Sequence, residues 1–124
     1  MNERMEFRYL VTSPDLNAHG TLHGGVLMQW ADEAAGMQAR KLTNRICVTR
    51  SIDNIDFVSK AQCGDIMRII TTLENTGTSS LGFRVSIKED ISNRLIANIS
   101  KIVFVSIDEK GNKVPHGVTK NESI

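Results

Sequence analysis

Apolar residues recur with a helical period in only one stretch of this chain, residues 26–41. There they follow one another at three- and four-residue intervals, which is typical of a helix that buries one side. They are Val26, Leu27, Trp30, Ala31, Ala34 and Ala35. Arg40 and Lys41 complement the negative end of the helix dipole, and the pattern ends at 42–44. The sequence therefore predicts one long helix, preceded by a polar loop over 17–25.

Before and after this helix, apolar and polar residues alternate in a way that is typical of β-strands. The expected strands span residues 5–11, 45–58, 66–75, 81–89 and 95–107. Short polar breaks separate the last four, so we expect an antiparallel sheet. One helix of about four turns can cover a face of such a sheet if the sheet curls around it. The predicted fold class is thus α+β, with one long central helix wrapped by a curved antiparallel sheet of about five strands.

The length of 124 residues and the hydrophobic fraction of 40% are those of one domain with a sizeable core. We expect a single domain over 1–124, with its core at about 5–116 and a flexible polar tail over 117–124. A single helix leaves apolar sheet surface uncovered and an edge strand unpaired. We therefore expect at least a symmetric homodimer.

Charge and cysteine usage narrow the class of protein. The formal net charge is +1, and charges of both signs are spread along the chain, which argues against a nucleic-acid-binding protein. No apolar run approaches the ~20 residues that span a bilayer, and the first residues have no signal-peptide core. Cys47 and Cys63 belong to no Cys-x-x-Cys pair, so Cys47 is interpreted as a small core residue in a reducing compartment. We expect a cytoplasmic protein with no membrane partner.

Two adjacent carboxylates, Asp32 and Glu33, interrupt the apolar pattern of the helix. They are about 100° apart around the helix axis, so they cannot face the same neighbour. We interpret Glu33 as solvent-exposed. Asp32 lies among small and apolar residues, where a partly desolvated carboxylate can take a proton from water or attack a substrate directly. Asp32 is therefore the candidate catalytic residue.

Gly24 and Gly25 stand where the loop meets the helix. They could form a plain turn, or they could let a ligand approach the N–H groups of the helix start, which would then act as an oxyanion hole. Asn17 could close an Asx-turn or donate its amide to a carbonyl or a water. His19 and His23 lack a third ligand, so we predict no metal site. The serine-hydrolase, phosphate-loop and dinucleotide motifs are absent from the sequence.

Residues 17–25 read Asn-Ala-His-Gly-Thr-Leu-His-Gly-Gly, and residues 27–36 read Leu-Met-Gln-Trp-Ala-Asp-Glu-Ala-Ala-Gly. Together they closely resemble the signature of the hotdog-fold acyl-CoA thioesterases, in the group of the bacterial YciA-like and animal cytosolic acyl-CoA hydrolases. Weaker similarity in later segments extends the resemblance over about residues 5–116. The resemblance implies a long helix wrapped by an antiparallel sheet. It also implies dimers that often assemble into hexamers, as a trimer of dimers.

The resemblance also implies roles for individual residues. In this family the active site lies at the dimer interface, with the helix Asp from one subunit and the loop Asn from the other. Asp32 would be the general base or nucleophile, and Asn17 would orient the water or the thioester. The Gly25 N–H would polarise the thioester carbonyl, and Gly24 and His23 would contact the substrate.

Further substrate contacts follow from the same resemblance. Thr78 and Ser79 would lie near the pantetheine or nucleotide part of CoA. His23 stands where many relatives have Phe, and Lys60 stands where close relatives usually have Pro. These two departures bear on substrate preference more than on the type of reaction.

We therefore predict an enzyme of lipid metabolism, an acyl-CoA thioesterase that hydrolyses acyl-CoA to a free acid and CoA. No cofactor is expected, because CoA is part of the substrate. The alternative is a non-catalytic acyl-CoA-binding or sensing module, which would need the tunnel but not the carboxylate. A hotdog dehydratase is a third and weaker option, because the His and acidic residue that it would usually place around the helix are not found.

Overall fold

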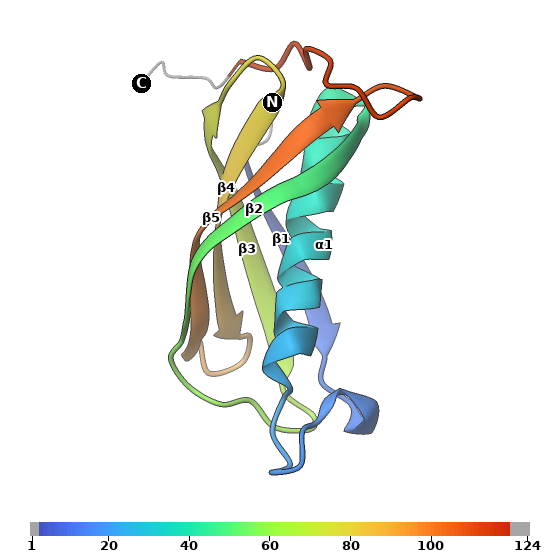
Figure 1. Ribbon diagram of the computed structural model, residues 1–124. Helices are drawn as coiled ribbons and strands as arrows, with labels where there is room; N and C mark the ends of the chain where they lie inside the picture. Colours follow the sequence, from blue (N-terminus) through green and yellow to red (C-terminus); the bar gives the residue numbers. More distant parts are fainter. Residues whose placement is uncertain (1–2, 120–124) are drawn as a thin grey trace.

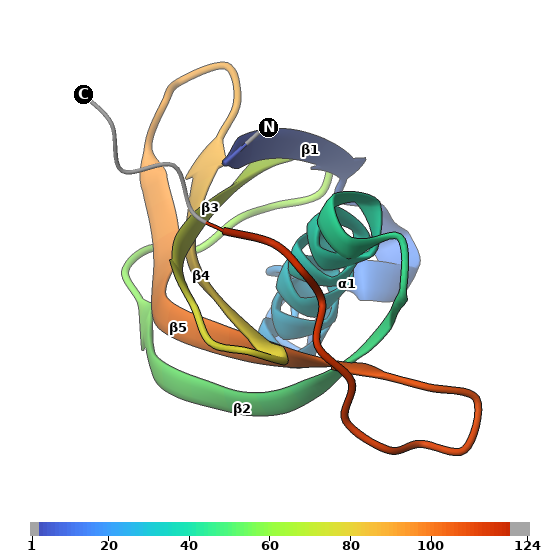
Figure 2. The same ribbon diagram turned by 90° about the horizontal axis from the view of Figure 1, so that it is seen from above.

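The structure is a computed structural model that describes residues 3–119, and it confirms the predicted α+β hotdog fold. One antiparallel sheet has the strand order β1-β3-β4-β5-β2. The strands are β1 (Arg4–Leu10), β2 (Ile46–Phe57), β3 (Ile66–Thr76), β4 (Ser80–Glu89) and β5 (Leu95–Ile107). The sheet curls around the long helix α1, Gly24–Thr43 (Figure 2). Most of the tail predicted to be flexible, from residue 120 on, lies outside the described residues.

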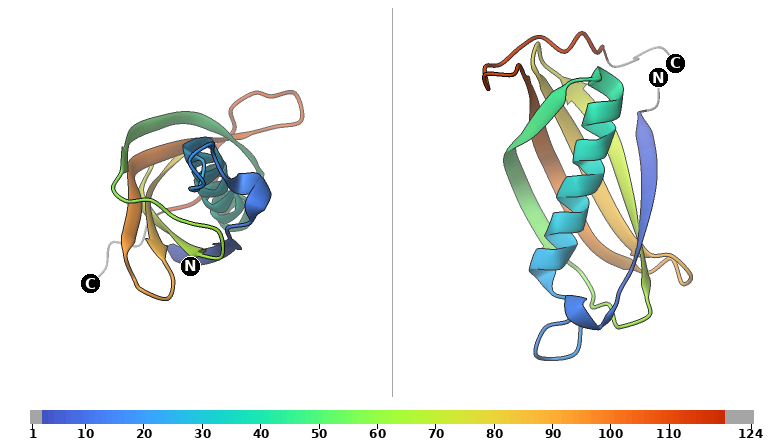
Figure 3. Two further views of the ribbon diagram at one scale, coloured as in Figure 1. Left: turned by 90° about the horizontal axis from the view of Figure 1, so that it is seen from below. Right: turned by 90° about the vertical axis from the view of Figure 1, so that its right-hand side faces the viewer.

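The helix fills the concave side of the sheet and contributes eight buried residues. Its buried residues are Leu27, Trp30, Ala31, Ala34, Ala35, Gln38, Ala39 and Thr43. They pack on inward-facing side chains of the three central strands, among them Ile69, Leu73, Phe83, Ile87 and Ile102. Because four of the helical residues are alanine, the helix axis can approach the sheet closely. Figure 3 shows α1 running between the two edge strands, β1 and β2, so one side of the helix remains uncovered.

The helix begins two residues earlier than the apolar pattern predicts. His23 is the N-cap, with extended backbone angles, and its Nδ1 accepts a hydrogen bond from the Gly25 N–H at 2.9 Å. This bond satisfies one of the N–H groups that have no partner inside the helix, and so stabilises an earlier helix start. Gly24 and Gly25 therefore belong to the helix and not to the preceding loop. At the other end Asn44 adopts the left-handed conformation with φ 53°, where the helix was predicted to end. No helix within residues 3–119 is long and apolar enough to cross a membrane.

Strand β2 lies at the edge of the sheet, where it pairs with β5 and leaves its other edge free. Its register shifts between Thr49 and Ser51, so the strand is bulged. Ile46, Val48 and Phe57 on this strand are between 43% and 58% exposed. A free strand edge with exposed apolar side chains is a surface that readily pairs with another chain. The free edge of β2 is therefore the surface at which we expect two copies of the chain to form a dimer.

A buried carboxylate holds the β4–β5 turn. Glu89 is only 5% exposed and accepts hydrogen bonds from the backbone N–H groups of Ile66, Ile91 and Ser92. These bonds, above all the one from Ser92, lower the pKa of Glu89 from 4.5 to about 2 in spite of its desolvation. The charged form of Glu89 therefore stabilises the folded chain.

Replacing Glu89 by Gln is expected to lower the melting temperature at neutral pH, because an amide oxygen is a weaker acceptor than a carboxylate for three N–H donors. Folding lowers the pKa of this group, so its stabilisation is complete above pH 4.5 and is lost as the pH falls toward 2. The melting temperatures of the two proteins, followed by circular dichroism, should converge over this range. An exposed control, Glu109→Gln, should melt with the native protein at every pH, and a constant deficit for the Glu89 variant would contradict the prediction.

Candidate active site

The loop before α1 holds Asn17 in a defined position. The Asn17 Oδ1 accepts hydrogen bonds from the backbone N–H groups of His19 at 2.9 Å and Thr21 at 3.2 Å, and its Nδ2 donates to Thr21 Oγ1 at 3.1 Å. The end of the loop is fixed by the His23 N–H, which donates to the carbonyl of Asp15. Asn17 therefore forms the predicted Asx-turn. Its second amide hydrogen has no partner within the described residues and remains available to a ligand.

At the start of the helix, the two glycine N–H groups differ. The Gly25 N–H is already bonded to His23 Nδ1, whereas the Gly24 N–H has no hydrogen-bond partner in the part of the chain that the structure describes. Phe57, at the end of β2, lies over Gly24: a Cβ added there would come within 3.3 Å of the ring. The free donor at the helix start is thus Gly24 and not the predicted Gly25. Within residues 3–119 no three His, Cys, Asp or Glu side chains gather closely enough to hold a metal ion.

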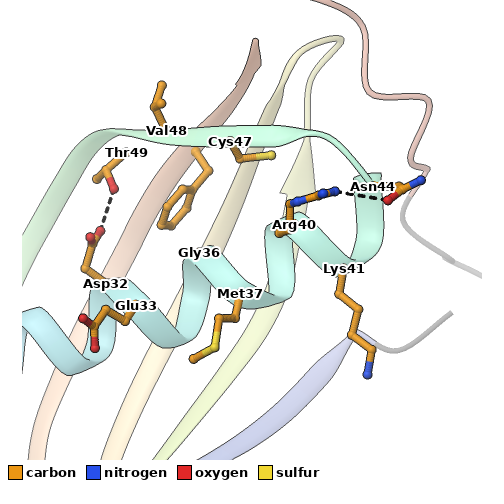
Figure 4. Close-up of a pocket in the computed structure, with 11 residues that line it drawn as sticks. Asp32, Glu33, Gly36, Met37, Arg40, Lys41, Asn44, Cys47, Val48 and Thr49 are labelled. Atoms are coloured by element: carbon orange, nitrogen blue, oxygen red, sulfur yellow. Dashed lines mark hydrogen bonds between the residues drawn. The ribbon is translucent and has the colours of Figure 1, made fainter. Parts of the chain in front are cut away.

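The carboxylate of Asp32 meets a hydroxyl on the neighbouring edge strand. Thr49 of β2 donates from Oγ1 to Asp32 Oδ1 at 2.6 Å (Figure 4). The other carboxylate oxygen of Asp32 has no hydrogen-bond partner among the described residues, so it is free to accept a proton. Thr49 could not be identified from the sequence, because only the packing of β2 beside α1 brings it to Asp32.

The Glu33 side chain points away from β2 (Figure 4). Its Oε2 accepts a hydrogen bond from Gln29 Nε2 at 3.2 Å. On that side Tyr9 of β1 stacks on Trp30, with ring centroids 4.9 Å apart. Burial raises the pKa of Tyr9, and the nearby charge of Glu33 raises it further. Asp32, and not Glu33, is therefore the carboxylate that contacts β2.

A groove of about 1010 Å³ runs between the second half of α1 and β2 (Figure 4). Asp32 and Thr49 line one part of it, and Met37, Val48 and Phe104 provide apolar walls. Arg40, two turns along the helix from Asp32, lines the far part. The groove can therefore hold an apolar chain whose reacting end lies at Asp32.

The structure does not bring all the predicted residues together within one chain. Gly24 and Asp32 are separated by about 12 Å along the helix axis. Thr78 and Ser79 lie in the β3–β4 turn, at the end of the molecule where α1 ends, whereas Asn17 lies near the start of α1 (Figure 1). A reacting carbonyl would have to lie about 3 Å from both the base and the oxyanion donor. One chain alone therefore cannot complete such a site.

Comparison with known proteins identifies the family. The family model of the thioesterase superfamily matches residues 19–95. The uncharacterized acyl-CoA thioester hydrolase YkhA of Bacillus subtilis is 36% identical over 104 residues, which make up 82% of this chain and 60% of that protein. This chain thus spans 60% of the length of that relative.

Solved structures agree in fold. An acyl-CoA hydrolase from Staphylococcus aureus, in complex with butyryl coenzyme A, coenzyme A and coenzyme A disulfide, matches with a TM-score of 0.79 and 33% identity, covering 91% of this chain and 68% of that one. An apo-hexameric acyl-CoA thioesterase matches with a TM-score of 0.82 and 32% identity, covering 91% and 74%. Alanine variants of an Asn, an Asp and a Thr of the S. aureus enzyme have also been solved, and those residues are spaced along its chain as Asn17, Asp32 and Thr49 are here. The chain belongs to the thioesterase superfamily.

Proposed function

We propose that this protein hydrolyses the thioester bond of acyl-CoA, releasing a free acid and CoA, with Asp32 as the base or nucleophile. One observation carries the proposal: a carboxylate oriented by Thr49 at 2.6 Å stands in an apolar groove, with its second oxygen free. The activities named for the relatives support it. So does the spacing of the three residues that were replaced in the S. aureus enzyme.

The chemistry needs few groups. In one route, the free oxygen of Asp32 takes a proton from water as the water attacks the thioester carbonyl. In the other, the carboxylate attacks the carbonyl itself and expels the CoA thiolate, and water then hydrolyses the resulting anhydride to the free acid. The carbonyl oxygen then develops negative charge, which the unpaired N–H of Gly24 and the unpaired amide hydrogen of Asn17 can stabilise. The CoA thiolate leaves readily, so a base and an oxyanion site are sufficient.

We further propose that the base and the oxyanion donors come from two copies of the chain. The separation of about 12 Å between Gly24 and Asp32 along one helix supports this proposal. Pairing of the free β2 edges across a two-fold axis would run the two helices antiparallel, with the start of one beside the second half of the other. In such a dimer the Thr78–Ser79 turn of the copy that supplies Gly24 lies near the Asn17 loop of the copy that supplies Asp32. This keeps Thr78 and Ser79 as candidate CoA contacts, on the side of Asp32 away from Arg40. The hexameric relative supports assembly of such dimers into a larger oligomer.

A thiol-release assay tests the proposed reaction directly. Short, medium, long and aryl acyl-CoA thioesters would be supplied one at a time, and CoA release would be followed with a thiol reagent. Isothermal titration calorimetry on the same thioesters would detect binding without turnover. Tight binding with no CoA release from any thioester would favour the non-catalytic binding module over the hydrolase.

Thr49 is expected to act as a positioning residue. Replacing it with Ala should lower kcat about ten- to a hundredfold, because Asp32 loses the hydrogen bond that orients its carboxylate. The KM should change little. Replacing Thr49 with Ser keeps the hydroxyl and should retain most of the activity. If the Ser and Ala variants lose the same activity, the hydroxyl has no such role.

A further inference from the structure

We propose that the groove between α1 and β2 selects acyl groups that carry a second carboxylate at their far end, with Arg40 binding that carboxylate. The inference deepens the proposed thioester hydrolysis and rests on it, because the reacting end of the acyl group is taken to lie at Asp32. The substrates would be CoA thioesters of dicarboxylic acids. Three features of the groove support this class: an unpaired cation, an open apolar middle and a matching length.

Arg40 is held in place but lacks a carboxylate partner. Its Nη1 donates to Asn44 Oδ1 at 3.1 Å, and Figure 4 shows its side chain running under β2 toward Asn44. No acidic side chain within residues 3–119 forms an ion pair with it, whereas Arg8 and Arg68 both pair with Asp90. A guanidinium has five N–H donors in a planar fork that matches a carboxylate. The donors that Asn44 does not use are therefore available to an anionic ligand.

The middle of the groove is open and apolar. Asp32, Gly36 and Arg40 follow one another at four-residue intervals, so they share one face of the helix. Gly36 has no side chain there, and a Cβ would come within 3.3 Å of the Phe104 ring. The chain between the two charged ends thus passes over Gly36 and Phe104. A run of methylene groups suits this surface, because it needs no hydrogen bonds.

The length of the groove and the charges at its two ends determine which end of the substrate lies at Asp32 and which lies at Arg40. Asp32 and Arg40 are about 12 Å apart along the helix, which an extended chain of about eight to ten carbon atoms can span. An extended pantetheine arm would carry the first CoA phosphate about 16 Å from the sulfur, beyond Arg40. A free carboxylate would be repelled at the other end by Asp32. The carboxylate therefore goes to Arg40, and the neutral thioester goes to Asp32.

The test compares suberyl-CoA, the monothioester of an eight-carbon dicarboxylic acid, with octanoyl-CoA. The native protein is expected to have the higher kcat/KM on suberyl-CoA. In Arg40→Gln the kcat/KM for suberyl-CoA divided by that for octanoyl-CoA should fall about three- to tenfold. This is the size of effect expected from the loss of one exposed, charge-assisted hydrogen bond. Arg40→Glu should lower it further. Lys113→Gln removes the same charge from an exposed residue that does not line the groove, and should leave the ratio unchanged.

Other outcomes would overturn the inference in recognisable ways. An equal fall for both substrates in Arg40→Gln would mean that Arg40 binds a CoA phosphate. If Arg40→Gln changes the elution volume in size-exclusion chromatography but leaves the ratio of the two kcat/KM values unchanged, a second copy of the chain occupies this part of the groove. A native preference for octanoyl-CoA would reject the dicarboxylic class while leaving the hydrolase proposal intact. If neither thioester nor any other acyl-CoA is hydrolysed, the proposed function itself fails.

Discussion

Replacing Asp32 with Asn is expected to lower kcat for acyl-CoA hydrolysis by about 10²- to 10⁴-fold, the usual contribution of a positioned general base. The amide keeps the shape of the carboxylate and can still accept the hydrogen bond from Thr49, so the fold should be retained. It cannot take a proton from water, and it is a poor nucleophile. Thiol release from one acyl-CoA under saturating conditions measures the effect, and a thermal melt checks the fold.

Glu33→Gln provides the matched control for this experiment. It removes a carboxylate one residue away, on the side of the helix that bonds to Gln29 instead of Thr49. Its turnover should stay near that of the native protein. Near-native turnover of the Asp32 variant on every acyl-CoA tested would reject Asp32 as the catalytic residue.

Replacing Gly24 with Pro is expected to lower kcat by about 10²- to 10³-fold, because it removes one N–H donor from the oxyanion site. Gly24 is the first residue of α1, where proline is favoured since its missing N–H has no partner in the helix. His23 already has the extended angles, φ −67° and ψ 129°, that a residue before proline adopts. The substitution should therefore remove a donor and leave the helix in place.

Gly24→Ala is the control for this change. Alanine puts the same Cβ against Phe57 and keeps the N–H, so the loss of activity that is specific to proline reports the donor. Equal losses in the two variants would mean that crowding of Phe57, and not the N–H, is responsible. A hybrid dimer of one Asp32→Asn chain and one Gly24→Pro chain should regain activity, because one of its two sites would have both intact residues. A hybrid as inactive as its parents would contradict a shared site.

The parts of this fold that depend on local pattern could be predicted from the sequence. Alternation located each strand to within a residue or two, and the alanine-rich period located the helix. The helix start was missed because it depends on a side-chain cap from His23, which apolar periodicity does not report. This cap also explains why Gly24, and not Gly25, has the free N–H.

The candidate site was predictable only where it is contained in a single segment. Asp32 could be selected from its neighbours along the helix and from the family resemblance. Thr49 could not, because it is 17 positions away in sequence and its role depends on the packing of β2 beside α1. Strand pairing between segments that are distant in sequence gives no signal in the alternation of either strand. The same limit applies to Arg40: only its surroundings show that it bonds to Asn44 and forms no ion pair among residues 3–119.

The strand order has a consequence for how the chain is made. β3, β4 and β5 pair with their neighbours in sequence, but β2 pairs with β5, so that Ile46 lies opposite Ile107. During synthesis, β2 and the apolar side of α1 leave the ribosome long before their partner strand does. Long-range pairing of this kind is slow, and the waiting segments are prone to aggregate. The segment that carries Asp32 and Thr49 therefore depends for its final structure on β5, which is translated well after it.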